Sequence, residues 1–365
     1  MMIAICLDGI AVSTVAVPWS PNSVLLWVLF TLQGTFEGVI NIAGQKLIMV
    51  IWKRDAPSPL HVLHLGFGIG SLIVPNIANP FLAVPAPMLS PSNGSGTVSA
   101  NISSYEHRLV FETENVSMNN SKESIVETSV FLCIERKINL MNILKKIEKN
   151  TETLRKKSFR EIIDPATCAH GDRTFGIIMF SLLFFFYINA VGGERILGKF
   201  IRNYSIDQLD FSVDEGSMIN TFFWISFSIG RFSGFIAARW IPIRILLPIE
   251  AFGALVSSIL LNIFARDSAT MLWVFILPVG FFEAPMFPSA MGWADSYLEM
   301  SGTGITFLLL GGASGGIAYM FIIGYFYDNY GNLSFLYQVL AFGIIAASLT
   351  VLLTIAGRGR GNRYD

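Results

Sequence analysis

Residues 26–37 read LWVLFTLQGTFE, and residues 272–283 read LWVFILPVGFFE. The two stretches share Leu, Trp, Val, Gly, Phe and Glu at matching positions, each pair 246 residues apart. The same offset relates two pairs of glycines in the following apolar segments: Gly66, Gly70, Gly312 and Gly316. A repeat in one ungapped register indicates two halves that are built alike and run in the same direction.

The composition places both copies in a membrane. Hydrophobic residues make up 53% of the 365 residues and charged residues 14%, against about 25% charged in soluble domains. The net charge of −1 excludes the basic surface of a nucleic-acid binder. The three cysteines, Cys6, Cys133 and Cys168, have no metal-ligand spacing. We therefore expect an all-α, multi-pass membrane protein without a metal site.

Nine segments are apolar enough over the roughly 20 residues that a bilayer core requires. They cover residues 1–19, 24–52, 61–84, 174–198, 216–238, 241–264, 270–293, 303–327 and 335–356.

A polar insert separates the two apolar blocks. Residues 88–173 hold 23 of the 51 charged side chains. The sequence therefore predicts a partial first half with three helices over 1–87, the insert over 88–173, and a second half with six helices over 174–365.

The repeat also predicts which helices the first half lacks. Two second-half helices precede the copy of residues 1–19, so their partners would lie before Met1. The partner of 335–356 would fall in the insert, where the stretch 125–144 carries four charges and is a poor solitary span. We expect an incomplete fold of about nine helices in two pseudo-symmetric halves.

Basic residues and glycosylation motifs predict the orientation. Basic residues near helix ends favour the cytoplasm, and these are Lys53, Arg54, Arg239, Arg244, Arg358, Arg360 and Arg363. Asn-X-Ser/Thr motifs belong outside. Four lie in the insert, at Asn93, Asn101, Asn115 and Asn119, and two lie elsewhere, at Asn203 and Asn332.

A polar stripe marks the segment 24–52. Gln33, Glu37, Asn41 and Gln45 follow one another at intervals of four and share a helix face. Amides and carboxylates suit a hydroxyl-rich ligand, so Asn41 and Gln45 are candidate substrate contacts. The alternative is hydrogen bonding between helices. Glu37 repeats as Glu283, which indicates a shared structural role.

The second half offers further polar residues. Asn189, Asn220 and Trp224 are candidate substrate contacts, and Trp293 is a second candidate for stacking on a sugar ring. The alternative for the tryptophans is packing or anchoring at the membrane interface. Arg231 is expected to pair with Glu283 or Glu194, since a buried arginine needs a carboxylate. Glu37, Glu283, Arg231 and Glu194 thus form a predicted polar lock or coupling group.

Gly312-Ala313-Ser314-Gly315 matches the G-x-S-G of intramembrane serine proteases. A serine nucleophile needs a base within reach, but no histidine follows Ser314 in the chain. The glycines also repeat at 66 and 70. Helix packing is the better interpretation, and we expect no enzyme.

The chain resembles the sodium-dependent glucose transporter branch of the major facilitator superfamily. The similar stretches are Gly38-Val39-Ile40-Asn41 with Gln45; Leu63-His64 with Gly66, Gly70 and Pro75; Asn220-x-x-Phe223-Trp224 with Arg231; Gly234 to Arg239; Phe287-Pro288-Ser289 with Trp293; and Gly311 to Gly315. The resemblance departs at Asn41 and Val191, where the branch usually has acidic residues, and Glu194 follows three residues after Val191.

The resemblance implies transport of a hexose such as glucose by alternating access in the plasma membrane, with sodium as a coupling ion and no bound cofactor. The expected partners are a small sugar and the lipid bilayer, with no nucleic acid and no protein partner indicated. Because three helices are expected to be missing, we expect little or no uptake by this chain. The alternative is a non-transporting membrane protein that acts through a partner or is a relic.

If the insert faces outward, its sequons carry glycans. We expect a glycosidase to increase the electrophoretic mobility of the protein from eukaryotic membranes, and replacement of Asn93, Asn101, Asn115 and Asn119 by Gln to reduce the shift. An insert shown to be cytoplasmic, with no shift, would contradict this topology.

Overall fold

The structure is a computed structural model that describes residues 2–78, 165–169 and 171–364. All of them belong to one unit, built from 1–81 and 159–365; the second unit, 82–158, lies outside the described residues. The four insert sequons and the weak crossing at 125–144 therefore also lie outside them.

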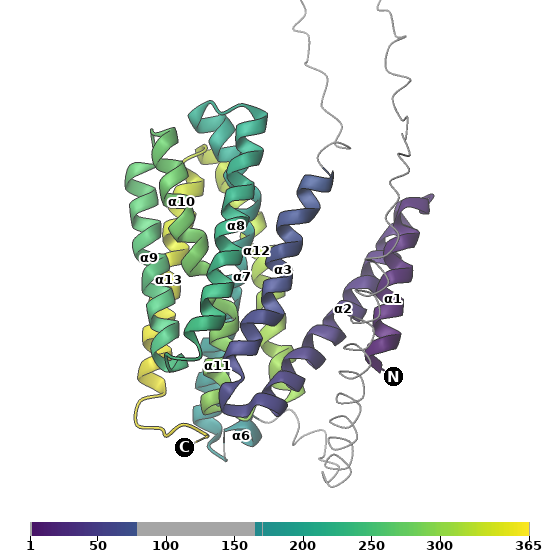
Figure 1. The fold of residues 1–365 in the computed structure, drawn as a ribbon, viewed down its shortest axis with the longest axis vertical. Coiled ribbons are helices and arrows are strands. Elements are labelled where there is room, and N and C mark those ends of the chain that lie inside the picture. The colour runs from purple at the N-terminus through teal and green to yellow at the C-terminus, as the bar shows by residue number, and fades with distance from the viewer. Residues whose placement is uncertain (1, 79–164, 170, 365) are drawn as a thin grey trace, which may run out of the picture. The chain divides into compact units, whose positions relative to one another are not determined.

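Every regular element within the described ranges is helical (Figure 1). The first block contains α1 (Met2–Ala16), the short turn η1 (Val17–Trp19), α2 (Ser23–Trp52), η2 (Lys53–Asp55) and α3 (Pro57–Ala78). The second contains α6 (Pro165–Cys168), α7 (Arg173–Leu209), α8 (Val213–Ala237), α9 (Ile243–Phe264), α10 (Ala269–Glu283), α11 (Met286–Tyr297), α12 (Gly302–Tyr330) and α13 (Ser334–Ala356).

Each of the nine predicted segments is mainly helical over its described residues. Six helical runs are long and apolar enough to cross a membrane. They are 23–55, 173–209, 243–264, 269–297, 302–330 and 334–356. The other three predicted spans correspond to α1, α3 and α8; α8 is a continuous helix that carries Arg231 and several polar side chains.

The internal repeat agrees with the helix boundaries. Shifted by 246, α2 covers 269–298, which is the range of α10 and α11 together, and α3 covers 303–324 inside α12. The copies differ at Ala284–Pro285, where the predicted single span 270–293 divides into α10 and α11. Proline has no N–H to donate and clashes with the preceding turn, whereas the matching Gly38 and Val39 leave α2 continuous.

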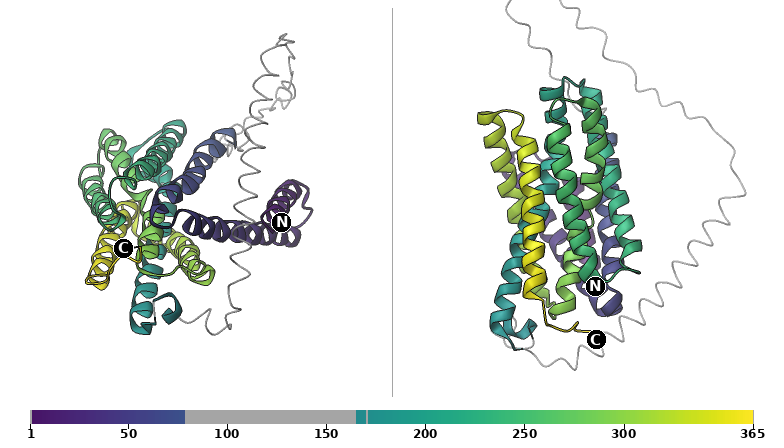
Figure 2. Two further views of the ribbon diagram at one scale, coloured as in Figure 1. Left: turned by 60° about the horizontal axis from the view of Figure 1, so that its bottom comes forward. Right: turned by 90° about the vertical axis from the view of Figure 1, so that its left-hand side faces the viewer.

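α3 joins the two blocks. It packs along α8 and α11, while α7, α9, α12 and α13 pack on one another within the second half (Figures 1 and 2). At one end of the contact, Ser58 Oγ donates to the Phe235 carbonyl at 3.0 Å. A single helix of the first block therefore makes most of its contact with the second.

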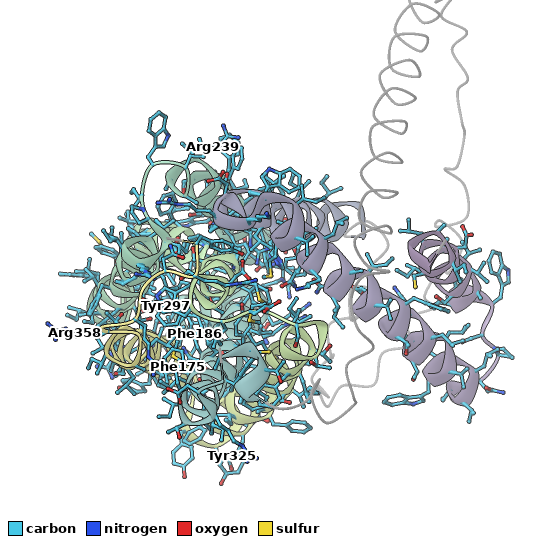
Figure 3. The ribbon with its side chains drawn as sticks, turned by 90° about the horizontal axis from the view of Figure 1, so that it is seen from below. Phe175, Phe186, Arg239, Tyr297, Tyr325 and Arg358 are labelled. Atoms are coloured by element: carbon cyan, nitrogen blue, oxygen red, sulfur yellow. The ribbon has the colours of Figure 1, made fainter. Side chains whose placement is uncertain are left out.

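The two ends of the bundle differ in chemistry. Arg360 pairs with Asp172, the N-cap of α7, and Arg363 pairs with Asp295 at the end of α11. The Phe175 N–H and the Arg360 guanidinium hold the pKa of the Asp172 carboxyl below its usual value. Figure 3 looks onto this end, with Arg239 and Arg358 at its rim.

The other end carries the described sequons. Asn203 is exposed near the end of α7, which extends beyond the predicted 174–198, and Asn332 Nδ2 donates to the Asp207 carbonyl at 3.0 Å. The basic residues and the glycosylation motifs were predicted to face opposite sides of the membrane, and the described members of the two sets lie at opposite ends of α7.

Glycine permits the closest helix contact. A Cβ on Gly315 of α12 would lie 2.1 Å from the Ile188 carbonyl oxygen of α7, whereas a Cβ on Gly66 of α3 would meet nothing within 4 Å. Ser314, beside this contact, donates to the Leu310 carbonyl of its own helix. The glycine motif therefore serves helix packing here, as predicted.

We expect Gly315→Ala to destabilise the protein by about 1–3 kcal/mol, because backbone must move to admit the methyl group. Gly66→Ala is the matched control, with unchanged or slightly higher stability because alanine favours helix. Thermal unfolding of purified protein in detergent measures both. Equal melting temperatures for the two variants would contradict the packing described.

Candidate functional site

A cavity of about 380 Å³ lies between α3, α7 and α8. It is lined by Phe67, Gly70, Ser71, Glu194, Arg195, Gly198, Lys199, Asn220 and Trp224. Both blocks therefore contribute to it. Three of its residues, Asn220, Trp224 and Glu194, are among those predicted from the sequence.

Local sequence places the α8 side chains. Ser212 and Glu215 form a capping box that starts the helix, and Asn220 and Trp224, four residues apart, share one face. The Asn220 Oδ1 atom is buried and has no hydrogen-bond partner among the residues that the structure describes. Because a buried amide oxygen without a partner is costly, it is suited to accept a hydrogen bond from a ligand.

Trp224 forms the aromatic wall of the cavity. Its ring lies against Gly198 of α7, where a Cβ would be 2.4 Å from the indole. Phe67 of α3 approaches the indole edge-on, with 6.1 Å between ring centroids. Glycine at position 198 is therefore required for this placement of the tryptophan.

Arg231 lies seven residues, about two helical turns, after Trp224 on α8 and is 2% exposed. Its Nη2 is 3.4 Å from Glu194 Oε2, its Nη1 donates to the His64 carbonyl at 2.6 Å, and its Nε donates to the Ala284 carbonyl at 3.2 Å. The guanidinium also lies 4.4 Å from the Phe227 ring centroid. Of the two carboxylates expected to pair with Arg231, the structure brings Glu194 into contact.

The other members of the predicted polar lock lie differently. Glu283 is 4% exposed, and neither carboxylate oxygen has a hydrogen-bond partner among the described residues. Glu37 is exposed on α2. The structure therefore brings together Arg231 and Glu194, with Glu283 buried and Glu37 on the surface.

The remaining predicted substrate contacts lie outside this cavity. Asn189 donates to the Phe342 carbonyl at 3.1 Å and accepts from the Tyr319 hydroxyl at 2.6 Å, so its amide joins α7 to α12 and α13. Gln45 is fully buried and donates to Asn41 at 2.7 Å, which confirms their shared face on α2. Trp293 is 1% exposed and packs on Tyr297.

Sequence reasoning missed four polar or aromatic lining residues: Phe67, Ser71, Arg195 and Lys199. Arg195 and Lys199 are exposed and lie four residues apart on α7, directly after Glu194. A charged pair at helical spacing beside an intramembrane glutamate was the available signal. No pattern singled out Phe67 or Ser71, since only the tertiary contact turns α3 toward α8.

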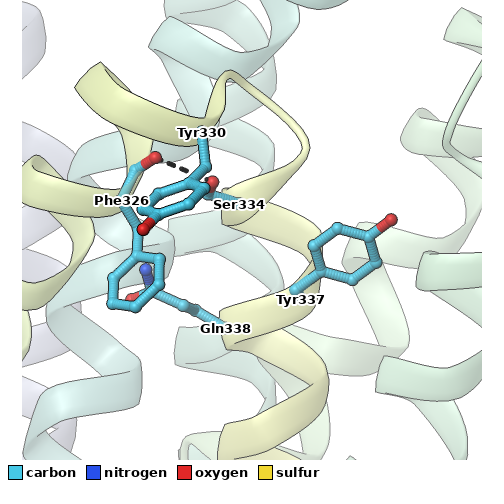
Figure 4. Close-up of a pocket in the computed structure, with 5 residues that line it drawn as sticks. All are labelled: Phe326, Tyr330, Ser334, Tyr337 and Gln338. Carbon is cyan, nitrogen blue, oxygen red and sulfur yellow. Dashed lines mark hydrogen bonds between the residues drawn. The ribbon is translucent and has the colours of Figure 1, made fainter.

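Two other cavities lie near helix ends. One of about 720 Å³ is lined mainly by the α2–α3 and α8 ends, including Trp52, Ser58 and Arg239. The other, of about 450 Å³, lies where α12 turns into α13 and is walled by Phe326, Tyr330 and Tyr337 (Figure 4). Tyr330 and Tyr337 are mostly exposed, as is typical of aromatics at a membrane interface. The cavity between α3, α7 and α8 is the better candidate for a transported solute.

The arrangement of these helices matches the major facilitator fold of solved structures. The Escherichia coli fucose:proton symporter matches 97% of this chain and 84% of its own with a TM-score of 0.63 at 14% identity. The human organic anion transporter MFSD10 matches 96% and 76% with a TM-score of 0.62 at 14% identity. The described helices thus make up part of a major facilitator fold in an integral, multi-pass membrane protein, as predicted.

The curated relatives are sodium-dependent glucose transporter 1 and major facilitator superfamily domain-containing protein 4A, which confirms the resemblance. The human glucose transporter is 23% identical over 338 residues, 91% of this chain and 62% of its own length. The zebrafish (Danio rerio) domain-containing protein 4A is 23% identical over 404 residues, 95% and 75%. This chain therefore spans about six tenths of the human relative. No family model matches. The transporter names agree with the prediction that the chain is not an enzyme.

The Arg231–Glu194 pair generates a stability prediction. Glu194→Leu leaves a buried guanidinium without its carboxylate, which costs about 3–5 kcal/mol. We expect the double variant Glu194→Leu/Arg231→Met to recover a substantial part of that loss, because no lone charge remains buried. Thermal unfolding in detergent tests both. A single variant as stable as the parent would show that the pair does not hold the helices together.

Proposed function

We propose that the cavity between α3, α7 and α8 binds a hexose such as glucose for transport across the plasma membrane by alternating access, with little uptake expected of this chain by itself. The observation that carries the proposal is that Asn220 and Trp224 line the same cavity, and that the buried Asn220 oxygen has no hydrogen-bond partner among the described residues. An amide oxygen accepts from a sugar hydroxyl, and an indole face packs on the apolar face of a sugar ring.

The position of the cavity also supports transport. Its walls come from the first block, through α3, and from the second, through α7 and α8. Relative movement of the blocks would therefore change access to it, as in transporters whose sites lie between repeats. Sodium coupling is part of this proposal and is supported by the names of the relatives.

A second candidate solute is an anionic sugar derivative. Arg195 and Lys199 line the cavity together with one carboxylate, Glu194. Two cations favour a ligand that carries a carboxylate. Competition by glucuronate against glucose distinguishes the candidates: stronger displacement by glucuronate favours the anion.

Binding is measured with radiolabelled glucose on the full chain in lipid nanodiscs. We expect Trp224→Ala to weaken binding about tenfold and Asn220→Ala about fivefold, through loss of a stacked ring and of one hydrogen bond. The matched controls are Trp240→Ala, which removes an 83% exposed tryptophan, and Asn329→Ala, whose amide bonds its own helix. Equal loss in all four variants would refute this site.

Uptake into proteoliposomes, with and without a sodium gradient, tests the transport step. Uptake that increases with an inward sodium gradient supports sodium coupling, and uptake independent of sodium contradicts it. Binding without uptake favours the non-transporting alternative.

A further inference from the structure

Three buried polar side chains meet where α3 contacts the second half. Ser289 of α11 donates to Glu250 Oε1 of α9 at 2.8 Å, and its Oγ lies 3.2 Å from His61 Nε2 of α3. The serine and the histidine are fully buried, and Glu250 is 3% exposed. One hydroxyl thus bridges a carboxyl of the second half to an imidazole of the first.

The cluster is incompletely bonded. His61 Nδ1 and Glu250 Oε2 are buried and have no hydrogen-bond partner within residues 2–78, 165–169 and 171–364. Gly234 of α8 admits the imidazole, since a Cβ there would lie 2.6 Å from the His61 ring. A carboxylate held by a single hydrogen bond in such a site is strongly destabilised unless it takes a proton or faces a cation.

Charges on the elements around the cluster are mostly engaged elsewhere. Arg231 of α8 bonds Glu194, Lys46 of α2 donates to the Met300 carbonyl, and Asp295 of α11 bonds Arg363 and Tyr364. The other ionisable groups on these elements are His64 of α3, the exposed Asp214 and Glu215 of α8, Glu283 of α10, Arg244 of α9, Tyr297 of α11, the exposed Glu37 and the turn residues Lys53, Arg54 and Asp55, while α13 has no acidic or basic residue. None of these groups forms a hydrogen bond to His61 or Glu250 in the described part of the chain.

The Ser289 hydroxyl allows a proton to move between Glu250 and His61. A serine hydroxyl has one hydrogen and can also accept. When Ser289 donates to ionised Glu250, it accepts from His61 Nε2–H of an imidazolium. When it donates to His61 Nε2, it accepts from the protonated Glu250 carboxyl. The two arrangements hold the same protons and carry no net charge, and the second, in which both groups are neutral, is the one that suits a buried site.

The connectivity differs from that of a serine hydrolase. There the carboxylate orients the histidine, which activates the serine. Here the carboxyl bonds the serine directly, and His61 Nδ1 has no partner among the described residues. The cluster is therefore suited to hold a proton and not to generate a nucleophile.

We propose that His61, Ser289 and Glu250 form a proton-binding site that locks α3 against α9 and α11. Loss of the proton leaves a negative charge buried in the contact between the two blocks. That charge becomes favourable only with water, so deprotonation opens the contact at this end of the bundle. The proposal does not rest on the identity of the solute or on transport.

The test follows the contact with a pair of spin labels on the full chain in nanodiscs. Asp55→Cys precedes α3 and Glu299→Cys follows α11, both at exposed positions. Cys6, Cys133 and Cys168 are replaced by Ala so that only the two introduced thiols take a label. We expect the distance between the labels to increase as the pH is raised. Glu250→Gln mimics the protonated carboxyl, so this variant keeps the short distance at every pH.

The matched control is Glu283→Gln, which neutralises another buried carboxyl without a partner. In this variant the distance between the two spin labels should still increase as the pH is raised. The proposal is overturned if the parent distance does not depend on pH, or if the response survives Glu250→Gln.

Infrared difference spectroscopy across the same pH range gives a readout independent of opening. We expect a protonated-carboxyl band that titrates in the parent protein, is lost in Glu250→Gln and is shifted in Ser289→Ala. An identical titrating band in Glu250→Gln would assign the proton elsewhere and overturn the proposal. Sugar binding is measured separately, so failure of the proposed function leaves this test intact.

Discussion

The buried guanidinium of Arg231 is the interaction on which the arrangement of the two blocks depends. It bonds Glu194 of α7, the His64 carbonyl of α3 and the Ala284 carbonyl at the break between α10 and α11. A charge this deep is stable only when carboxylate and carbonyl oxygens surround it. One α8 side chain thereby determines how α3, α7 and the α10–α11 break meet, and its partner Glu194 also lines the candidate cavity.

The polar chemistry concentrates where α3 meets the second half. The cavity, the Arg231 pair and the cluster of His61, Ser289 and Glu250 all lie along this contact, whereas the interior between α7, α9, α12 and α13 is largely apolar. An apolar interior favours a permanent bundle. A contact made of hydrogen bonds and protonatable groups can exist in two arrangements of similar free energy, which relative movement of the blocks requires.

Much of the fold was predictable because a bilayer permits few structures for an apolar segment. The nine apolar segments became helices, and the 246-residue offset anticipated the correspondence of α2 with α10 and α11. The candidate site was less predictable. Asn189 and Asn220 looked alike in sequence, yet Tyr319 and the Phe342 carbonyl use the Asn189 amide, whereas the Asn220 oxygen has no hydrogen-bond partner among the described residues. Helical periodicity gives a residue's face but not what lies opposite that face.

By itself the sequence determined the membrane setting, the helical segments, the repeat and the resemblance to sugar transporters, because each depends on local hydropathy or on order along the chain. Only the tertiary structure decided that Arg231 pairs with Glu194, that Trp224 lies against Gly198, and that His61 meets Ser289 and Glu250. The residues in those contacts are separated by between 26 and 228 positions along the sequence. They arise from the packing angles of whole helices, which no local pattern encodes.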